Sequence, residues 1–183
     1  MSGAATLTRD GFVLRPLGPS DLDVHLAAID DEQIRWLWEP GDGDRWYAMT
    51  PQVQRERQRK YLEATYNEFG PGPKWAFAMD APDAAYVVYI DCDLAIPDAP
   101  PGSANISYSC HPAHRRKGYT VRAIGLVCEF LRQETAATEA NLAVELDNAP
   151  SLGVVRAVGA SEVSRYVDQH GRTMIRHVLP LRR

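Results

Sequence analysis

The residues best suited to chemistry in this chain form a short basic run, Arg115-Arg116-Lys117-Gly118. The run lies in a stretch from Ala99 to Cys128 without aspartate or glutamate, although the whole chain has a net charge of -4. An apolar pattern typical of a helix follows Gly118. The first turn of a helix carries unpaired N–H groups and a partial positive charge, which acids usually offset. Because the first acid here is Glu129, the segment predicts an anion-binding turn, most simply for a phosphate.

An ordinary solvated basic cap is the alternative interpretation of Arg115 to Lys117. It is the weaker one, because helices usually carry cations at their other end. The sequence contains no G-x-x-x-x-G-K-[ST], no G-x-G-x-x-G after a strand, and neither H-E-x-x-H nor G-x-S-x-G. These absences disfavour a P-loop, a dinucleotide fold, a zinc protease and a serine hydrolase. Cys110, His111 and His114 lie together, but the neighbouring cations disfavour a metal ion, and we expect none.

A second candidate group combines aromatic and acidic side chains in one early segment. Its members are Trp36, Trp38, Glu39, Asp42, Asp44, Trp46 and Tyr47. Aromatic walls with carboxylates suit a cationic amine. We therefore expect Trp36, Trp38, Glu39 and Trp46 to bind the amine of a substrate. The alternative, which the density of tryptophans slightly favours, is that these residues are ordinary core.

The apolar periodicity indicates which elements position these residues. The expected strands are Phe12–Leu17, Lys74–Met79, Ala85–Asp91, Asn105–Cys110, Leu142–Leu146, Val163–Val167 and Thr173–Leu179. Four helices are expected. The first begins at Ser20-Asp21, the second runs from Gln52 to about Phe69, and the last spans Pro150 to about Val158. The third follows Gly118 and has on one face Val121, Ile124, Val127, Cys128 and Leu131. Pro40, Gly41 and Gly43 are expected to end an apolar region over Ile34–Trp38.

This order of elements predicts an α/β (α+β) fold. We expect a mixed, mostly antiparallel central sheet of six to seven strands with helices on both faces. The chain has 183 residues, of which 45% are hydrophobic, so it can bury a sizeable core. The loop from Pro97 to Gly102 separates patterns that belong to one sheet, so we expect a single domain over residues 1–183.

The segment from Ile106 to Ile124 resembles the acetyl-CoA-binding segment of the GNAT superfamily of N-acetyltransferases. That family's pattern, Q/R-x-x-G-x-G/A, is occupied here by Arg115-Arg116-Lys117-Gly118-Tyr119-Thr120. The run Asp147-Asn-Ala-Pro-Ser151, followed by Gly159, is similar to the N-x-x-S…G segment of the ribosomal-protein (Rim-type) acetyltransferase branch. The opening Leu14-Arg-Pro-Leu17 is similar to that branch as well. The resemblance covers nearly the whole chain and implies a GNAT-like fold.

Acetyl-CoA is the cosubstrate that the resemblance implies. It places the pyrophosphate on the basic turn, where Gly118 allows close backbone approach, and the pantetheine arm along the strand that ends at Cys110. It places Asn148 near the pantetheine amides, although helix capping explains an asparagine there equally well. The residues expected to bind the cofactor are Cys110, His111, Arg115, Arg116, Lys117, Gly118, Tyr119, Thr120, Asn148 and Ser151.

Transfer to an amine requires an oxyanion donor and a proton for the departing thiolate. The backbone N–H of Cys110 or His111 is the candidate oxyanion donor. The resemblance implies that Ser151 lies near the sulfur and protonates it. We therefore expect Ser151 to be catalytic.

The amine must also lose a proton, because a lysine-like amine has a pKa of about 10.4. Relatives in this branch often place an acid where Asn105 stands, and an amide cannot act as a base. Glu145 is the candidate base, with Asp91, Asp93 or a water chain as alternatives.

Composition narrows location and partners. The three cysteines form no C-x-x-C pair, which indicates neither disulfides nor zinc and favours a reducing cytoplasm. The acidic balance disfavours nucleic-acid binding. No apolar run is long enough to cross a membrane, and the first residues lack a secretion-signal pattern. The oligomeric state is open, and a homodimer is compatible with the sequence.

The leading hypothesis is an N-acetyltransferase that moves an acetyl group from acetyl-CoA to a primary amine of a protein N-terminus or a small molecule. The alternative from another class is a non-catalytic acyl-CoA-binding sensor or assembly subunit, which the missing acid at Asn105 motivates. A nucleic-acid binder that uses Arg115 to Lys117 is the weakest hypothesis.

Overall fold

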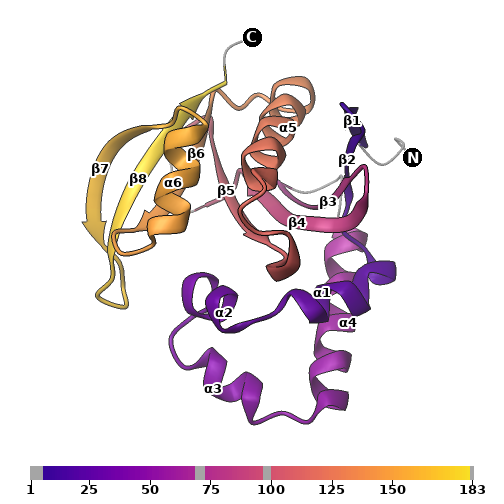
Figure 1. Cartoon of the computed structure of the whole chain (residues 1–183). Helices are drawn as coiled ribbons and strands as arrows, with labels where there is room; N and C mark the ends of the chain where they lie inside the picture. Colours follow the sequence, from indigo (N-terminus) through magenta and orange to yellow (C-terminus); the bar gives the residue numbers. More distant parts are fainter. Residues whose placement is uncertain (1–5, 69–72, 97–99, 182–183) are drawn as a thin grey trace.

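One mixed sheet organises the protein, as Figure 1 shows for the computed structural model, which describes residues 6–68, 73–96 and 100–181. The strand order is β1-β2-β3-β4-β5-β6-β8-β7, and among these neighbours only β5 and β6 are parallel. The strands are β1 (Leu7–Arg9), β2 (Phe12–Pro16), β3 (Lys74–Ala81), β4 (Ala84–Asp93), β5 (Ser103–Cys110), β6 (Glu139–Glu145), β7 (Ser161–Val167) and β8 (Thr173–Pro180). The expected mostly antiparallel sheet is confirmed, with eight strands in place of six to seven.

Helices precede, connect and cover these strands. They are η1 (Pro19–Asp21), α1 (Leu22–Ala28), α2 (Asp31–Leu37), α3 (Asp42–Tyr47), α4 (Pro51–Glu68), η2 (Pro112–His114), α5 (Tyr119–Glu134) and α6 (Ala149–Ala157). Helix α4 begins at Pro51, one residue before the expected Gln52. The expected end of that helix at Phe69 lies outside the described residues.

Strand β1 and helix α3 are among the elements that were not predicted from the sequence. Strand β1 pairs with β2 through a turn at Asp10 and Gly11, which have φ angles of 51° and 79°. An Asp-Gly pair with two positive φ angles is typical of a tight hairpin. Helix α3 follows Gly41, whose φ of 86° breaks the chain direction, and acids in its first turn favour a helix start. Gly41 therefore lies between helices α2 and α3, whereas the sequence predicted only that an apolar region ends there.

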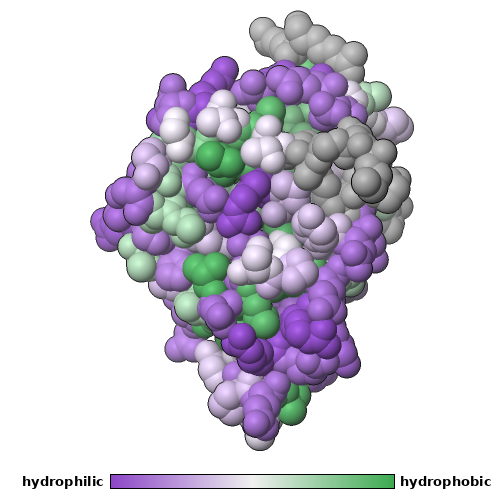
Figure 2. All heavy atoms as spheres, turned by 90° about the vertical axis from the view of Figure 1, so that its right-hand side faces the viewer, coloured by the Kyte–Doolittle hydropathy of each residue, from purple (hydrophilic) through white to green (hydrophobic). Residues whose placement is uncertain are grey.

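The core lies on both faces of the sheet because β3 alternates. Phe77 and Met79 pack in one cluster with residues of α5, whereas Ala76 and Ala78 pack on the other face with Leu62 of α4. Helices on both faces are thereby confirmed. Of the apolar positions expected on α5, only Val121 is not fully buried. Figure 2 shows that the face bearing the outer side of α4 is largely hydrophilic, as the charged sequence of that helix requires.

Beneath α4 a buried histidine ties two helices to the sheet. His25 of α1 is hydrogen-bonded through Nδ1 to the Tyr86 hydroxyl and through Nε2 to Gln58, 3.2 Å away. Burial lowers the pKa of His25 from its ordinary value of 6.5. The neutral ring therefore stabilises the fold above pH 6.5, and this contribution is lost as the pH falls through the lowered pKa.

We accordingly expect the melting temperature to fall between pH 7 and about pH 5, where the unfolded chain protonates its histidine first. Thermal unfolding followed by circular dichroism measures the effect. The His25→Gln variant, which keeps a polar side chain but does not titrate, should show a smaller fall over this range. An equal fall in both proteins would contradict this role for His25.

Candidate active site

Strands β5 and β6 form a fork in the middle of the sheet. Strand β5 pairs with β4 from Asn105 to Cys110, but it pairs with β6 only from Ser103 to Asn105. The edge of β5 that faces away from β4 is therefore without a strand partner over residues 106–110 of the described chain. An open strand edge can pair with an extended ligand that carries its own amide groups.

The register identifies which backbone groups line this edge. The N–H of His111 donates to the carbonyl of Val87 at 3.0 Å, which makes Cys110 and Val88 a non-hydrogen-bonded pair. The N–H and C=O groups of Cys110 therefore point away from β4, toward the fork. Alternation along the strand gives Tyr108 and Ile106 the same orientation. The expectation that the His111 N–H is free as an oxyanion donor is therefore wrong, whereas the Cys110 N–H faces the open edge.

After β5, the chain makes a turn that opens into α5. Arg116 and Gly118 have φ angles of 66° and 76°, and Gly118 is the N-cap of α5. Such left-handed residues orient consecutive N–H groups in the same direction. The first turn of α5 contains no acid, and a Cβ added to Gly118 would meet no atom within 4 Å. The start of α5 is thus open and positive, as the sequence predicted.

The three basic residues of the turn differ in their contacts. Arg115 donates to both carboxylate oxygens of Asp30, at 2.7 and 2.8 Å, and to Glu32 at 2.9 Å. These contacts lower the pKa of Asp30, whose side chain also caps α2 by accepting from the N–H of Gln33. Arg116 and Lys117 are exposed and have no ion pair with another described residue. A phosphate at this turn would therefore meet Arg116 and Lys117, whereas Arg115 links the turn to α2.

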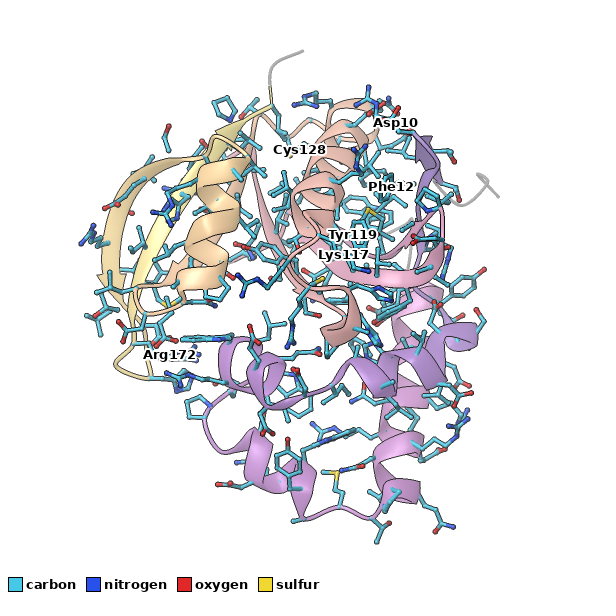
Figure 3. All side chains as sticks on the ribbon, viewed as in Figure 1. Asp10, Phe12, Lys117, Tyr119, Cys128 and Arg172 are labelled. Atoms are coloured by element: carbon cyan, nitrogen blue, oxygen red, sulfur yellow. The ribbon has the colours of Figure 1, made fainter. Side chains whose placement is uncertain are left out.

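Residues near the turn differ in their exposure. Thr120 is buried next to Cys110, and burial raises the pKa of the Cys110 thiol. Cys110 Sγ contacts the carbonyl of Val87 at 3.5 Å, which indicates packing. The His111 ring accepts from the N–H of Ala113, and burial lowers its pKa. Figure 3 shows Lys117 and Tyr119 at the N-terminal end of α5, next to the basic turn.

A cavity of about 280 Å³ flanks the same end of α5. It is lined by Arg9, Gly118, Val121, Arg122, Gly125 and Leu126. The cavity thus begins at the residue that closes the basic turn.

On the other side of the fork, α6 begins with the second predicted motif. Asn148 is buried and caps α6, because its side-chain oxygen accepts from the N–H of Ser151 at 3.1 Å. The capping role of Asn148 is therefore present, and it leaves the amide nitrogen of the side chain for a ligand. Burial raises the pKa of the Tyr108 hydroxyl, and the nearby side chain of Ser151 offsets part of that rise.

A second cavity, of about 320 Å³, brings together several residues expected at an acceptor site. It is lined by Ile34, Arg35, Trp38, Glu39, Pro40, Gly41, Gly43, Asp44, Glu145 and Arg172. Glu145 thus lines the same cavity as Trp38 and Glu39, although more than a hundred residues separate it from them in the sequence. Figure 3 shows that Arg172 comes from the loop between β7 and β8 and lies beside α2.

Two other tryptophans have different surroundings. Trp46 is buried and packs edge-on against Trp38, with ring centroids 5.4 Å apart, so it supports the cavity wall. Trp36 is not among the lining residues and instead carries the Arg35 guanidinium 4.5 Å from its ring centroid. The sequence did not identify Arg35, Arg172 or His170, which is paired with Glu39, because only the fold brings the β7–β8 loop here.

The alternative bases lie away from this cavity. Asp91 is buried and accepts from the Tyr89 hydroxyl at 2.5 Å, and burial raises the pKa of Asp91. Asp93 accepts from the N–H of Ala95 at 2.8 Å. Asn105 accepts from the side chain of Asn141 at 3.1 Å, just where the fork opens. Glu145 is therefore the only one of the three candidate carboxylates among the cavity's lining residues.

Within the described ranges, no group of three or more His, Cys, Asp or Glu side chains could hold a metal ion. The helices in those ranges are also too short or too polar to span a membrane.

Comparison with protein families decides the relationship. Residues 12–161 match the model of the acetyltransferase (GNAT) domain. The chain belongs to the GNAT family. This GNAT protein is therefore an acetyltransferase by family, and the family uses acetyl-CoA. No curated protein matches the sequence.

Solved structures show the same fold as this GNAT chain at low sequence identity. Ribosomal-protein-S5-alanine acetyltransferase from Vibrio fischeri is 13% identical, with a TM-score of 0.74 and 96% of each chain covered. Mycobacterium smegmatis RimJ in complex with CoA-disulfide is 16% identical, with a TM-score of 0.75, covering 97% of this chain and 86% of that one. Spermidine N-acetyltransferase from Vibrio cholerae, in complex with CoA and spermine, is 13% identical, with a TM-score of 0.70 over 94% and 97% of the two chains.

Proposed function

We propose that this protein transfers an acetyl group from acetyl-CoA to a primary amine by direct attack of the amine on the thioester. The observation that carries the proposal is the open edge of β5 leading into the acid-free start of α5. The backbone groups of Ile106, Tyr108 and Cys110 would pair with the amides of the pantetheine arm. The first N–H groups of α5, with Arg116 and Lys117, would hold the pyrophosphate.

The second cavity is the proposed acceptor site. Its carboxylates, from Glu39, Asp44 and Glu145, outnumber its guanidinium groups, and Arg172 is already paired with Asp168 at 2.7 Å. Trp38 supplies an aromatic wall, which suits an amine that arrives charged. Glu145 would remove the proton that the charged amine must lose before it attacks, and the second amine proton would pass to water. Ser151 would donate a proton to the departing sulfur and regain one from water. The acceptor is an amine of a peptide N-terminus or a small molecule.

A non-catalytic acyl-CoA sensor is the second candidate, and the hydrogen bond between Asn105 and Asn141 favours it. Asn105 carries an amide, which cannot act as a base, at a position where the resembling branch often has an acid. Glu145 of the neighbouring strand β6 nevertheless offers a carboxylate at the proposed acceptor cavity, so acetyl transfer stays the first candidate. The cytoplasmic location stays a prediction from the sequence.

Binding and turnover distinguish the two candidates. Calorimetry with CoA should show binding, and incubation of acetyl-CoA with peptides, polyamines or aminoglycosides should release free thiol and add one acetyl group to an amine. Binding without release across the whole panel, unaffected by Ser151→Ala, would support the sensor. Absence of binding would refute both functions.

A further inference from the structure

The proposed acceptor cavity contains one positive charge that no acid within the described ranges neutralises. Of its two arginines, Arg172 is paired with Asp168. Arg35 is exposed and forms no ion pair with a described side chain. Its guanidinium carbon lies 4.5 Å from the centroid of the Trp36 ring. This contact holds the charge in place without using its N–H donors on an oxygen, so they are free for a ligand.

The acids that would ordinarily neutralise Arg35 are engaged elsewhere. Residues three or four positions apart on a helix are neighbours, and Asp31 and Glu32 precede Arg35 at these spacings. Glu39 follows it four residues on, just beyond the end of α2. Asp31 accepts from a tyrosine hydroxyl of α3, Glu32 is paired with the arginine of the basic turn, and Glu39 is paired with the histidine of the β7–β8 loop. The fold thus keeps a cation unpaired among acids.

The same cavity also presents carboxylates without a cation. Asp44 and Glu145 line it, and neither forms an ion pair with a described side chain. A complementary ligand therefore carries a positive amine and a negative group together. The volume of about 320 Å³ lies near the lower end of the range of roughly 300 to 1,000 Å³ for small-molecule pockets. An amino acid is a small molecule that combines the two charges.

The inference rests on the proposed acetyl transfer and names its acceptor. We propose that the acceptor is a free amino acid whose carboxylate binds the Arg35 guanidinium while its amine faces Glu145. A guanidinium recognises a carboxylate through two parallel N–H···O bonds. A diamine has no group for Arg35 and brings a second positive charge toward it. A peptide N-terminus has a neutral amide where the amino acid has its carboxylate. Both are therefore expected to be poorer acceptors.

The test compares each amino acid with its own amide, which keeps the amine and the side chain and removes the negative charge. The acceptor panel is extended by glycine, leucine, phenylalanine, lysine and their amides, and thiol release gives kcat/KM for each. For the best pair, we expect kcat/KM of the free acid to exceed that of the amide about 10-fold, the low end for a hydrogen bond to a charged group. Reactivity alone would favour the amide, because a carboxylate raises the pKa of a nearby amine and keeps it protonated.

Variants of Arg35 assign the preference to this residue. Arg35→Gln should abolish the preference for the free acid, and Arg35→Glu should reverse it in favour of the amide. Arg45→Gln is the matched control, because Arg45 is exposed, is paired with Asp42 and does not line the cavity. It should keep the wild-type preference. Melting temperatures within a few degrees of the wild-type value verify that the variants fold.

The outcomes separate this inference from the proposed function. Equal turnover of acids and amides, or a preference that survives Arg35→Gln, would overturn the inference and leave acetyl transfer intact. If the wild-type protein released no thiol with any acceptor, acetyl transfer would be refuted, and calorimetry with the same pairs would decide the inference. Tighter binding of the acid than of its amide, lost in Arg35→Gln, would support an amino-acid site, and equal or absent binding would overturn it.

Discussion

Glu145→Gln is expected to lower kcat by about 100-fold, the low end of the contribution usual for a general base. Glu145 ends strand β6 and lines the proposed acceptor cavity together with Trp38 and Glu39. Glutamine keeps the size and polarity of the side chain but cannot accept the amine proton. Steady-state kinetics with the best amine of the panel measures the loss, and the melting temperature should stay within a few degrees.

Glu39→Gln provides the contrast within the same cavity. Glu39 lines the cavity, is exposed and is paired with His170, so it would attract a charged amine without reaching the thioester. We expect a several-fold rise in KM with little change in kcat, the pattern of lost binding that is equal in ground and transition states. An unchanged kcat in Glu145→Gln would remove Glu145 as the base and return attention to Asp91.

Gly118→Ala is expected to weaken CoA binding roughly 10- to 100-fold, which corresponds to about one charge-assisted hydrogen bond. The added methyl group meets no protein atom, so it would occupy the space proposed for the pyrophosphate. Because Gly118 has a φ of 76°, the substitution also costs about 1 kcal/mol of backbone strain.

Gly159→Ala isolates that strain. Gly159 has the same φ of 76° and the same free space, but it follows the far end of α6. Both variants should lose similar stability in urea unfolding, whereas only Gly118→Ala should lose affinity in calorimetry. Equal affinities would show that the pyrophosphate does not approach this residue.

The sequence predicted the sheet, its main helices and the basic turn because those features depend on local periodicity and on a local deficit of acids. The hairpin at Asp10-Gly11 escaped because β1 is too short to show alternation. Helix α3 escaped because glycines that end one helix can also precede another. Strand β6 begins at Glu139, earlier than expected. Arg176 of β8 donates to the Glu139 carboxylate at 2.9 Å and so holds a polar residue in the strand. A contact between distant segments cannot be read from a local sequence pattern.

The candidate site was predicted in part. The fold brings Trp38, Glu39 and Glu145 to one cavity, whereas it assigns Arg115 to ion pairs and Trp36 to a contact with Arg35. Ion-pair partners come from distant segments, so residue types near one another in the sequence cannot identify them.

The ion pairs of Arg115 have a consequence for redesigning this enzyme. Asp30 both begins α2 and holds the arginine of the cofactor turn, and α2 leads directly into the wall of the acceptor cavity. A new specificity segment transplanted over residues 30–47 must therefore bring an acid at its first position. Without that acid, the graft would leave a guanidinium unneutralised at the mouth of the phosphate turn and alter cosubstrate binding along with acceptor choice.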